Sequence, residues 1–490
     1  MPDITQLDHR HVWHPFTQMR DWLKSDPVVI CSGRGAWLKD AKGRRYLDGN
    51  ASIWTNLHGH RHPEINRAIT RQLGKIAHSS ALGLANEPAS LLAGELVRVA
   101  NPKRRVTRTE LARTSGPLPW KGARRIPRLH KVFYSDDGST ALEVALKLAY
   151  EYSRRTGQSR RPRFLSLEGA YHGDTVGAVS LGHIDLFHKA YAGLLFKSDR
   201  VMAPYCYRCP FNRARAERTD ARVHRKCGWE CVGRVAQRLE RQSKQGRPYA
   251  GMVVEPLMQG AAGMIAHPAG WLRQVSELLR GHGGLLIADE VMTGFGRMGH
   301  GISGHAPLFA CHREGVQPDF MALAKGLTGG YLPMAATLTT RAVFDAFLGE
   351  QEEFKTFFHG HSYTGNQLGA AAGLASLKIL ETPASRRARA GLEGALQASL
   401  ETLWELPHVG DIRREGLVAG VELVRDWRTR EPYEPRLRAG LRVCDAMRKG
   451  GVLTRPVGNV VVLMPPYCAT ISEVEKMVRV LGASVREVLG

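Results

Sequence analysis

The chain has 490 residues, 43% of them hydrophobic, which is enough for two or three domains with a sizeable buried core. Lys and Arg outnumber Asp and Glu by 69 to 46, but no nucleic-acid recognition motif accompanies this excess, so we expect no nucleic-acid partner. No run of about 18 apolar residues occurs, and the first residues, MPDITQLDHRHVWHPF, do not resemble a signal peptide, so we expect a cytoplasmic protein without membrane contact.

The N-terminal residues predict a hairpin followed by two helices. Residues 28–49 alternate between apolar and polar side chains, which predicts a hairpin that turns at Ala41 to Gly43. Residues 63–77 and 88–100 have apolar side chains at helical spacing. These helices would lead into a larger domain.

Two later segments differ from the rest in composition. Residues 103–129 are rich in basic residues, proline and glycine, and predict an inserted surface loop without a role of its own. Residues 205–232 form a second insert, which contains Cys206, Cys209, Cys227 and Cys231 in C-x2-C and C-x3-C pairs. This spacing is typical of tetrathiolate zinc sites, and free thiols are the alternative. We assign no metal to the reaction, because any zinc would only hold this segment together.

A helix with an open amino terminus is predicted from Gly138. Apolar side chains recur at helical spacing in GSTALEVALKLAY, and Gly138, Ser139 and Thr140 place free amides and hydroxyls at the start. Such a terminus can be a simple cap or can bind a phosphate dianion. A short strand at 163–167 then leads into GAYHGDT, where Tyr171 offers a flat ring for stacking.

Two short apolar runs end in residues of opposite charge. Leu285 to Ala288 predicts a buried parallel strand that ends at Asp289, where open α/β sheets place their ligands. Phe320 to Ala324 is a second such run, and it leads directly into Lys325 and flexible glycines. Either residue alone would more often be a helix cap or a surface group. Together with the phosphate-binding terminus they suggest pyridoxal phosphate, which needs a lysine, an acid and a helix start.

Further elements are predicted in the remaining sequence. They are a strand entering a glycine loop (252–264), helices at 268–280, 341–348, 366–380 and 385–403, strands within 409–424 and 459–466, and a last helix at 472–489.

A series of motifs follows along the chain: YSDDGSTALEVALK, GAYHGDT, EPLMQGAAGM, LIADEVMTGFGRMG, LAKGLTGG and FFHGHSYTGN. In sequence and order they resemble the class III aminotransferases of fold type I. WHPFTQM, FFHGHSYTGNQ and LTRPVGNVVVLMPPY further resemble the 7,8-diaminopelargonic acid aminotransferases of biotin synthesis. The resemblance implies an α/β fold with a mainly parallel, seven-stranded sheet and a smaller α/β domain built from both termini. Residues 71–350 would form the large domain, and 1–70 and 351–490 the small one.

The resemblance also implies roles for the predicted site residues. Lys325 would be the catalytic amine that holds the cofactor aldehyde, and Asp289 would keep the ring nitrogen protonated. The cofactor phosphate and ring would contact Gly138, Ser139, Tyr171 and Val291. His361 and Ser362 would reach the phosphate of the partner subunit, so the enzyme would be a homodimer with shared active sites.

Substrate contacts follow from the same resemblance. Small-molecule substrates would enter a channel lined by Phe16, Ile53, Trp54, Tyr171 and Gly360. Arg455 would bind the carboxylate of the amino acceptor, and Arg297 would lie near the site.

The expected reaction is amino transfer to 8-amino-7-oxononanoate, giving 7,8-diaminononanoate. S-adenosylmethionine is the expected donor, and lysine is the alternative, because Ile53 stands where well-known members carry a tryptophan and Val462 where some carry a tyrosine. Another class III ω-transaminase would share the cofactor residues but lack the combination of WHPFTQM and LTRPVGN. A cofactor-free scaffold would lack Lys325 or Asp289.

Overall fold

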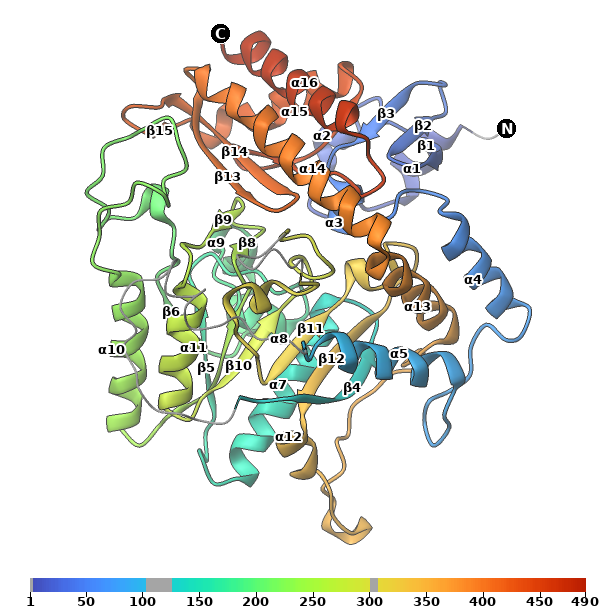
Figure 1. Cartoon of the computed structure of the whole chain (residues 1–490), viewed down its shortest axis with the longest axis vertical. Coiled ribbons are helices and arrows are strands. Elements are labelled where there is room, and N and C mark those ends of the chain that lie inside the picture. The colour runs from blue at the N-terminus through green and yellow to red at the C-terminus, as the bar shows by residue number, and fades with distance from the viewer. Residues whose placement is uncertain (1–2, 103–125, 300–306) are drawn as a thin grey trace.

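The computed structural model describes residues 3–102, 126–299 and 307–490. Its largest element is a seven-stranded sheet in the order β4-β12-β11-β10-β7-β5-β6 (Figure 1). The strands are β4 (Leu129–Ser135), β5 (Arg163–Leu167), β6 (Asp199–Val201), β7 (Tyr249–Val254), β10 (Leu285–Asp289), β11 (Phe320–Leu323) and β12 (Ala335–Thr340). β12 runs antiparallel to β11 and β4, and the strands from β11 to β6 pair in parallel. The prediction of a mainly parallel seven-stranded sheet is therefore confirmed.

Both faces of this sheet are buried, because alternate residues of each strand enter different apolar clusters. Leu286 of β10 belongs to one cluster, which includes Val235 and Trp271. Its neighbour Ile287 belongs to the other, which includes Ala145. Consequently α7 (Gly138–Arg155) covers one face, and the pair α10 (Glu230–Lys244) and α11 (Trp271–Gly281) covers the opposite face. This arrangement explains why the central strands read as continuous apolar runs.

Further helices surround the sheet and extend from it. They are α4 (Pro63–Leu73), α5 (Glu87–Val99), α8 (Val176–Leu181), α9 (Asp185–His188), α12 (Arg341–Asp345) and α13 (Gln367–Glu381). α13 packs against α4, α5 and the turn that begins at Lys325. Short 3₁₀ turns occupy Lys189–Leu194, Cys206–Arg208, Ala310–Glu314, Lys325–Thr328, Gln351–Glu353, Thr402–Glu405 and Pro435–Leu437.

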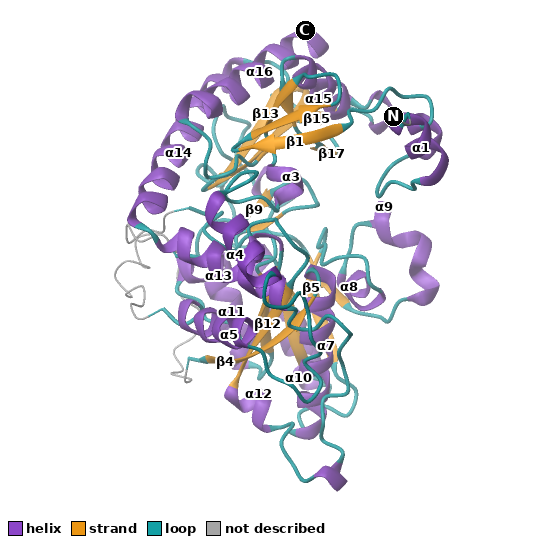
Figure 2. Cartoon of the chain, turned by 90° about the vertical axis from the view of Figure 1, so that its right-hand side faces the viewer, coloured by secondary structure: helices purple, strands orange, loops and turns teal. Residues whose placement is uncertain are grey.

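A second layered part lies beside the large sheet and combines both ends of the chain (Figure 2). One sheet has the order β1-β2-β3-β16, and another has the order β13-β14-β18-β17 with β15 paired to β14. The strands are β1 (Ile30–Arg34), β2 (Trp37–Asp40), β3 (Arg45–Asp48), β13 (Val409–Glu415), β14 (Val418–Asp426), β15 (Glu431–Pro432), β16 (Val452–Leu453), β17 (Pro456–Val457) and β18 (Val460–Leu463). Because β16 pairs with β3, N-terminal and C-terminal strands share one sheet. The exact domain boundaries stay a prediction.

Helices complete this second part. They are α14 (Pro383–Glu401), α15 (Ala439–Lys449) and α16 (Ile471–Leu489), with α1 (Ile4–His11), α2 (Met19–Trp22) and α3 (Ala51–Trp54) near the N-terminus. α16 packs against both α14 and α15. The small strands β8 (Met258–Gln259) and β9 (Ile265–Ala266) form a ribbon that follows β7, and β9 touches β13.

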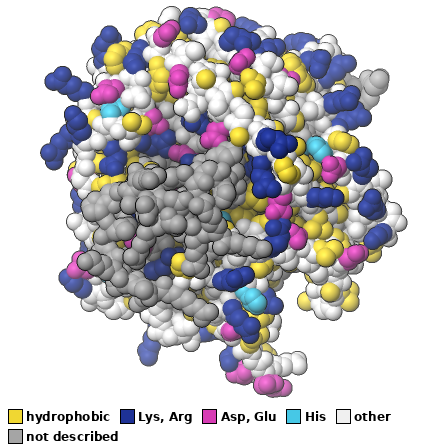
Figure 3. All heavy atoms as spheres, viewed as in Figure 1, with side chains coloured by type: hydrophobic (Ala, Val, Ile, Leu, Met, Phe, Trp, Pro, Cys, Tyr) yellow, Lys and Arg dark blue, Asp and Glu magenta, His cyan; other side chains and the backbone are white. Residues whose placement is uncertain are grey.

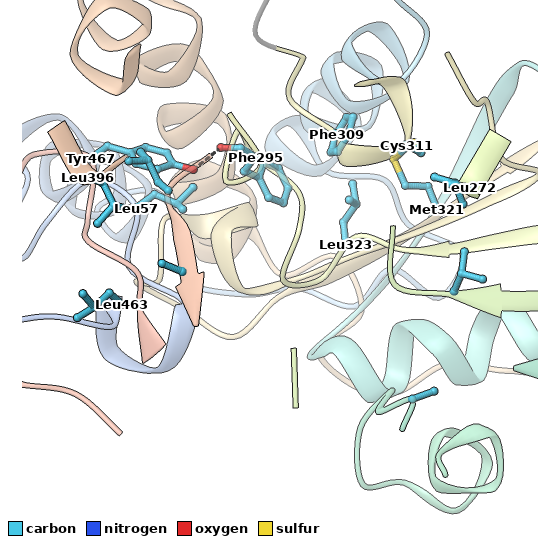
Figure 4. Packing of buried hydrophobic residues seen from close by; sticks show 14 of the residues in the cluster. Leu57, Leu272, Phe295, Phe309, Cys311, Met321, Leu323, Leu396, Leu463 and Tyr467 are labelled. Carbon is cyan, nitrogen blue, oxygen red and sulfur yellow. Dashed lines mark hydrogen bonds between the residues drawn. The ribbon is translucent and has the colours of Figure 1, made fainter. Parts of the chain in front are cut away.

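One continuous core joins the two parts (Figure 4). Leu323 and Phe295 contribute from the large-sheet side, and Leu396 and Leu463 from the C-terminal part. The hydroxyl of Tyr467 donates a hydrogen bond to the carbonyl oxygen of Phe295 at 2.9 Å, across the junction. The two parts are thus held in a fixed relation by apolar packing and by at least one buried hydrogen bond.

The predicted hairpin and helices are present with small shifts at their ends. β2 and β3 pair antiparallel around the turn at Ala41 to Gly43. The helix predicted to reach residue 77 ends at Leu73, and Gly74 follows as its cap. Residues 103–125 of the predicted basic insert lie outside the described residues, and its last residue, Leu129, begins β4.

The surface carries dispersed charge. Lys and Arg side chains are spread over the face drawn in Figure 3, with Asp and Glu side chains between them. Among the described helices, none combines the length and the apolar character needed to cross a membrane.

Candidate active site

Asp289 and Lys325 lie at the same edge of the large sheet. β10 and β11 are parallel neighbours, and Asp289 pairs with Ala322, three residues before Lys325. The carboxyl ends of both strands therefore point to the same side, where α/β sheets bind ligands. Lys325 begins a 3₁₀ turn with a φ of 46°, a left-handed conformation that is costly for a residue with a side chain. Such backbone strain is typical of functional sites.

The amine of Lys325 is placed among apolar and aromatic surfaces. Its Nζ lies 4.9 Å from the ring centroid of Trp54. Burial lowers the pKa of Lys325 below its ordinary value, whereas the negative charges of Asp289 and Glu255 raise it. A lysine whose pKa is lowered in this way more readily supplies the neutral amine that can attack an aldehyde.

Two buried residues that were not singled out from the sequence complete the surroundings of Asp289. Nδ1 of His172 lies 2.8 Å from Oδ2 of Asp289, and the backbone N–H of Val291 donates to Oδ1 at 3.1 Å. Glu255 accepts hydrogen bonds from the N–H groups of Tyr171 and Gly260. Burial is the main reason why the pKa of Glu255 rises to about 7. Both residues had a sequence signal, since His172 stands in GAYHGDT and Glu255 follows strand β7 directly.

The start of α7 forms a tight cradle. Asp137 caps the helix by accepting from the N–H of Thr140, which leaves the first N–H groups of the helix and the hydroxyl hydrogen of Ser139 for another partner. A Cβ at Gly138 would lie 2.8 Å from Cγ1 of Val291, so only glycine allows this approach. The hydroxyl of Ser139 accepts from the N–H of Asp174 at 3.1 Å, and it can still donate to an anion.

An aromatic wall stands beside the cradle. The hydroxyl of Tyr171 donates to Asp174 at 2.7 Å, and its ring is parallel to that of His188, with 6.4 Å between the centroids. The ring of Phe16 lies 6.5 Å from that of Tyr171 in an edge-on orientation. Phe16 and Tyr171 are therefore brought together, as expected for a lined channel.

Ile53 and Trp54 are presented by an unusual left-handed turn. The four residues Ala51, Ser52, Ile53 and Trp54 have φ values of 49°, 49°, 60° and 71°. Left-handed helical geometry costs about 1–2 kcal/mol per residue for L-amino acids. Asp48 compensates in part, because it accepts hydrogen bonds from both the N–H and the hydroxyl of Ser52. This strained turn directs Trp54 toward Lys325.

The loop that contains Gly360, His361 and Ser362 has few contacts with the site of its own chain. His361 is exposed, and its Nδ1 lies 3.4 Å from Oδ2 of Asp136, next to the helix start. Ser362 is exposed as well. Among the described residues, no hydrogen bond, ion pair or ring contact links these loop residues to Lys325 or Asp289. Of these loop residues, His361 is therefore the one that approaches the start of α7 within its own chain, through Asp136.

Arg455 lies in the C-terminal part, between β16 and β17. Its side chain is exposed and forms no ion pair with a described residue. The preceding Thr454 donates its hydroxyl hydrogen bond to the carbonyl of Val462, and Val462 belongs to the apolar cluster against which Trp54 packs. Arg455 is therefore available to an anion, and its neighbour Thr454 ties this segment to the cluster that Trp54 joins.

Arg297 has a different environment. Its guanidinium is buried and donates to the carbonyl oxygens of Pro465 and Asn56 at 2.7 and 2.8 Å. Burial lowers the pKa of Arg297. Because two carbonyls use its donors, Arg297 ties chain segments together and is not presented to a substrate.

The cysteines of the insert gather around one small cavity. Cys206, Cys209, Cys227 and Cys231 all contribute to its walls. Burial raises the pKa of Cys206 and of Cys231 to about 12, so these two thiols stay protonated at neutral pH. Within the described ranges, no three His, Cys, Asp or Glu side chains are arranged to hold a metal ion. The zinc alternative therefore gains no geometric support.

These observations fit a bound pyridoxal phosphate. The cradle at Gly138 closes if a Cβ is added, Asp289 is a buried acceptor at the sheet edge, and the amine of Lys325 has a lowered pKa. The three parts satisfy the phosphate, ring nitrogen and aldehyde of that cofactor.

Comparison with known proteins agrees with this chemistry. The model of the class-III aminotransferase family matches residues 20–485. An adenosylmethionine-8-amino-7-oxononanoate aminotransferase of Geobacter sulfurreducens is 47% identical over 100% of both chains. The crystal structure of the Methanocaldococcus jannaschii enzyme with the same name superposes with a TM-score of 0.85, at 37% identity over 99% of both chains. A PLP-bound amine transaminase from an uncultivated Pseudomonas species superposes with a TM-score of 0.83, at 32% identity over 98% of this chain and 99% of the other.

Proposed function

The chain belongs to the class-III aminotransferase family, and on that premise we propose that it transfers an amino group to 8-amino-7-oxononanoate to form 7,8-diaminononanoate. It is a pyridoxal-phosphate enzyme, as its family is. The full-length likeness to enzymes named for this acceptor carries the substrate assignment, because it extends over the C-terminal part that presents Arg455 as well as the cofactor residues.

The cofactor would be held by the residues of the cradle and the sheet edge. Gly138 and Ser139 would bind the phosphate, and Tyr171 and Val291 would enclose the ring. Pyridoxal phosphate supplies an aldehyde that accepts the amino group and a protonated ring that takes up electrons. Asp289 would keep that proton on the ring nitrogen, and His172 holds Asp289 in place through its 2.8 Å hydrogen bond.

Lys325 is the proposed catalytic residue. Its amine would hold the cofactor aldehyde, and once an amino donor has displaced it, the free amine would accept and donate the proton as general base and acid. The lowered pKa of Lys325 favours the neutral amine that this step requires. The aromatic ring of Trp54 lies beside this amine, and the rings of Tyr171 and Phe16 would flank the bound substrate.

Arg455 would bind the carboxylate of the acceptor. Its planar guanidinium can hold a carboxylate through two parallel hydrogen bonds, and it lies exposed without a competing ion pair among the described residues. Phe16, Ile53, Trp54 and Gly360 would line the channel for the aliphatic chain. Exposed aromatic and aliphatic side chains suit this apolar part of the substrate.

S-adenosylmethionine is the proposed amino donor, since the relatives are named for it. Lysine remains the alternative donor. Ile53 is smaller than the tryptophan that well-known members carry at this position, and Val462 lacks the hydroxyl of the tyrosine that some members carry. The two donors can be separated by adding each to the cofactor-loaded enzyme and recording the loss of the cofactor absorbance in a single turnover.

We also propose a homodimer that shares its active sites. The loop with His361 and Ser362 does not reach its own Lys325 through any described contact, and the neighbouring Phe354, Phe358 and Tyr363 are 73%, 75% and 60% exposed. Such exposed aromatic side chains indicate a surface that another chain covers. The cytoplasmic location expected from the sequence stays a prediction.

A second candidate function is a less specific amine transaminase, which the structural likeness to the Pseudomonas enzyme favours. The decisive experiment compares the turnover of the keto acid 8-amino-7-oxononanoate with that of simple aldehydes and ketones. The proposal expects the keto acid to be preferred at least about tenfold in kcat/KM, because a bound carboxylate contributes more than about 1.4 kcal/mol. A preference for uncharged carbonyl compounds would assign the chain to the second candidate. In parallel, borohydride treatment should fix the cofactor to Lys325, and an unmodified Lys325 would overturn both assignments.

A further inference from the structure

A second cavity, of about 720 Å³, lies outside the candidate active site. It is bounded by α10, the end of β6 and the segment 202–211, on the side of the molecule where α10 and β6 are labelled in Figure 1. We propose that this cavity binds a small molecule that carries at least two phosphate groups. This assignment is independent of the proposed transamination.

One face of α10 supplies most of the charge. Arg234, Arg238 and Arg241 are spaced so that they emerge on the same side of the helix, and all three line the cavity. Arg200, at the end of β6, lines it as well. Four guanidinium groups thus come from two different elements and surround one space.

These arginines are short of acidic partners. No described residue forms a hydrogen bond or an ion pair with the side chain of Arg200, Arg238 or Arg241. Arg234 reaches only the neutral Gln237, at 3.5 Å. Among the described lining residues, Glu168 is the one carboxylate. Arg200, Arg234 and Arg241 are exposed and Arg238 is half-buried, so water solvates these charges. Like charges on one helix face still repel each other, and a bound anion would supply pairing that the described lining residues offer only through Glu168.

A fifth arginine in the same wall does have an acidic partner. Arg208 also lines the cavity, but its guanidinium pairs with Glu422 of β14. Glu422 is buried and further accepts a hydrogen bond from Arg413. Arg208 therefore holds the segment 205–232 against the C-terminal part. The four other arginines are available to a ligand.

The remaining wall is apolar and aromatic. Met202, Tyr205 and Phe211 line it, and the guanidinium of Arg234 stands 5.7 Å from the ring centroid of Phe211. The volume is in the range of sites for drug-sized ligands, which is about 300–1,000 Å³. Arginine forks match phosphate oxygens, and an aromatic wall suits a flat organic ring. A nucleoside diphosphate has this combination of charge, ring and size.

The cavity is distinct from the cofactor cradle. None of its described lining residues belongs to the set that includes Gly138, Tyr171, Asp289 and Lys325. Its floor includes Glu168 and Gly169, which precede Tyr171 in the same loop. This loop therefore contributes Glu168 and Gly169 to the cavity and Tyr171 to the candidate active site.

The test uses the cofactor-loaded full chain, so that the phosphate cradle at α7 is filled. Isothermal titration calorimetry would measure the binding of adenosine diphosphate, adenosine and inorganic phosphate. We expect adenosine diphosphate to bind, and the double variant Arg238→Gln/Arg241→Gln to bind it at least about tenfold more weakly, since charge-assisted hydrogen bonds are the strong ones. The matched control is Arg479→Gln/Arg486→Gln, which removes the same charge from exposed positions of α16.

Each outcome decides the proposal. Equal weakening in both double variants would mean that the net charge alone attracts the anion, and this would overturn the site. A lack of adenosine diphosphate binding at about 1 mM, which corresponds to a binding free energy weaker than about 4 kcal/mol, would overturn it as well. Tighter binding of a single-stranded oligonucleotide through the same arginines would overturn the small-molecule assignment in favour of nucleic acid. If the α10 variant does not fold, Arg200→Gln tests the cavity from β6. Binding lost in Arg200→Gln and kept in the control supports the site, and binding unchanged in Arg200→Gln overturns it.

Discussion

Nδ1 of His172 lies 2.8 Å from Oδ2 of Asp289, and both side chains are buried at the edge of the large sheet. A carboxylate only accepts hydrogen bonds, so Nδ1 is the protonated nitrogen and donates to Asp289. The pair joins the loop after β5 to the end of β10. It fixes the carboxylate on which the ring nitrogen of the cofactor depends.

Removing this hydrogen bond should weaken catalysis without unfolding the protein. We expect His172→Leu to lower kcat by about 10- to 100-fold, because a hydrogen bond to a charged group is worth about 1.5–3 kcal/mol. The affinity for pyridoxal phosphate should fall as well, which absorbance titration of the apoenzyme measures. His282→Leu, which removes a histidine bonded to Ser243 away from the site, is the control and should behave as the unchanged protein. A normal kcat in His172→Leu would show that Asp289 needs no such support.

The raised pKa of Glu255 should make stability depend on pH. Burial raises this pKa from 4.5 to about 7, so between these values the folded protein keeps a proton that the unfolded chain has released. The unfolded state then binds fewer protons, and stability falls as the pH rises from about 4.5 to 7, by at most about 3 kcal/mol. Glu255→Gln should flatten this part of the profile, as urea unfolding at about pH 5 and about pH 7 would measure. Glu487→Gln, at an exposed position of α16, should leave the slope unchanged. An equal slope in Glu255→Gln would contradict the assignment.

A substitution of Arg455 should change the kinetics with the amino acceptor and leave those with the amino donor unchanged. For the acceptor, Arg455→Ala is expected to raise KM by about 10- to 100-fold, because the carboxylate loses a charge-assisted bidentate partner. The first half of the reaction, with the amino donor, should proceed at its normal rate, which stopped-flow absorbance can follow. Arg479→Ala, another exposed arginine, serves as the control. An unchanged KM for the acceptor would remove Arg455 from the site.

The left-handed turn at Ala51 to Trp54 should lower the free energy of unfolding while it positions the side chains of Ile53 and Trp54. Ile53 has a φ of 60° and is 46% exposed, so Ile53→Gly relieves strain and loses little buried surface. We expect the free energy of unfolding to stay equal or to rise by up to about 1 kcal/mol. The rise is limited because glycine also increases the conformational entropy of the unfolded chain. Ile76→Gly, a similarly exposed isoleucine outside the positive-φ positions, should lower stability by about 1 kcal/mol. Denaturant unfolding of both variants decides this, and a clear loss of stability in Ile53→Gly would show that the turn is not strained.

The exposed aromatic residues after α12 should mediate association of two chains. Phe358 is 75% exposed, so Phe358→Asp costs little within one chain but would place a charge in an apolar contact between chains. We expect light scattering after gel filtration to show a dimer for the unchanged protein and a monomer of low activity for this variant. Val223→Asp, at a residue that is 79% exposed in the cysteine-containing segment, should remain dimeric. A monomeric unchanged protein with full activity would exclude shared sites.

Several features of the site could be predicted from sequence because they depend on local pattern. The apolar runs before Asp289 and Lys325 were long enough for strands and too short for helices, and their strands are parallel neighbours in the sheet. The opening of α7 at Gly138 was visible because glycine and hydroxyl residues precede an amphipathic repeat. The roles of the individual site residues stay predictions.

Other features depend on residues that are far apart in the sequence. Glu255 follows a strand as Asp289 does, but its proximity to His172 and Lys325 arises only when β7 and β10 pair. The left-handed turn was not predicted, since Ala, Ser, Ile and Trp have no local preference for positive φ; Asp48 and the surrounding packing impose it. Arg297 was expected near the site, yet its donors are used by the carbonyls of Asn56 and Pro465.

The sequence by itself determined the element types and the chemistry that the chain can perform, because strand runs, helix starts and reactive residue types are local properties. Only the tertiary structure decided which charges lose their solvent. Burial lowered the pKa of Lys325 and raised that of Glu255, whereas Arg234 and Arg241 of α10 stayed exposed to solvent beside an open cavity. Desolvation depends on how every neighbouring element packs, and no single stretch of sequence contains that information.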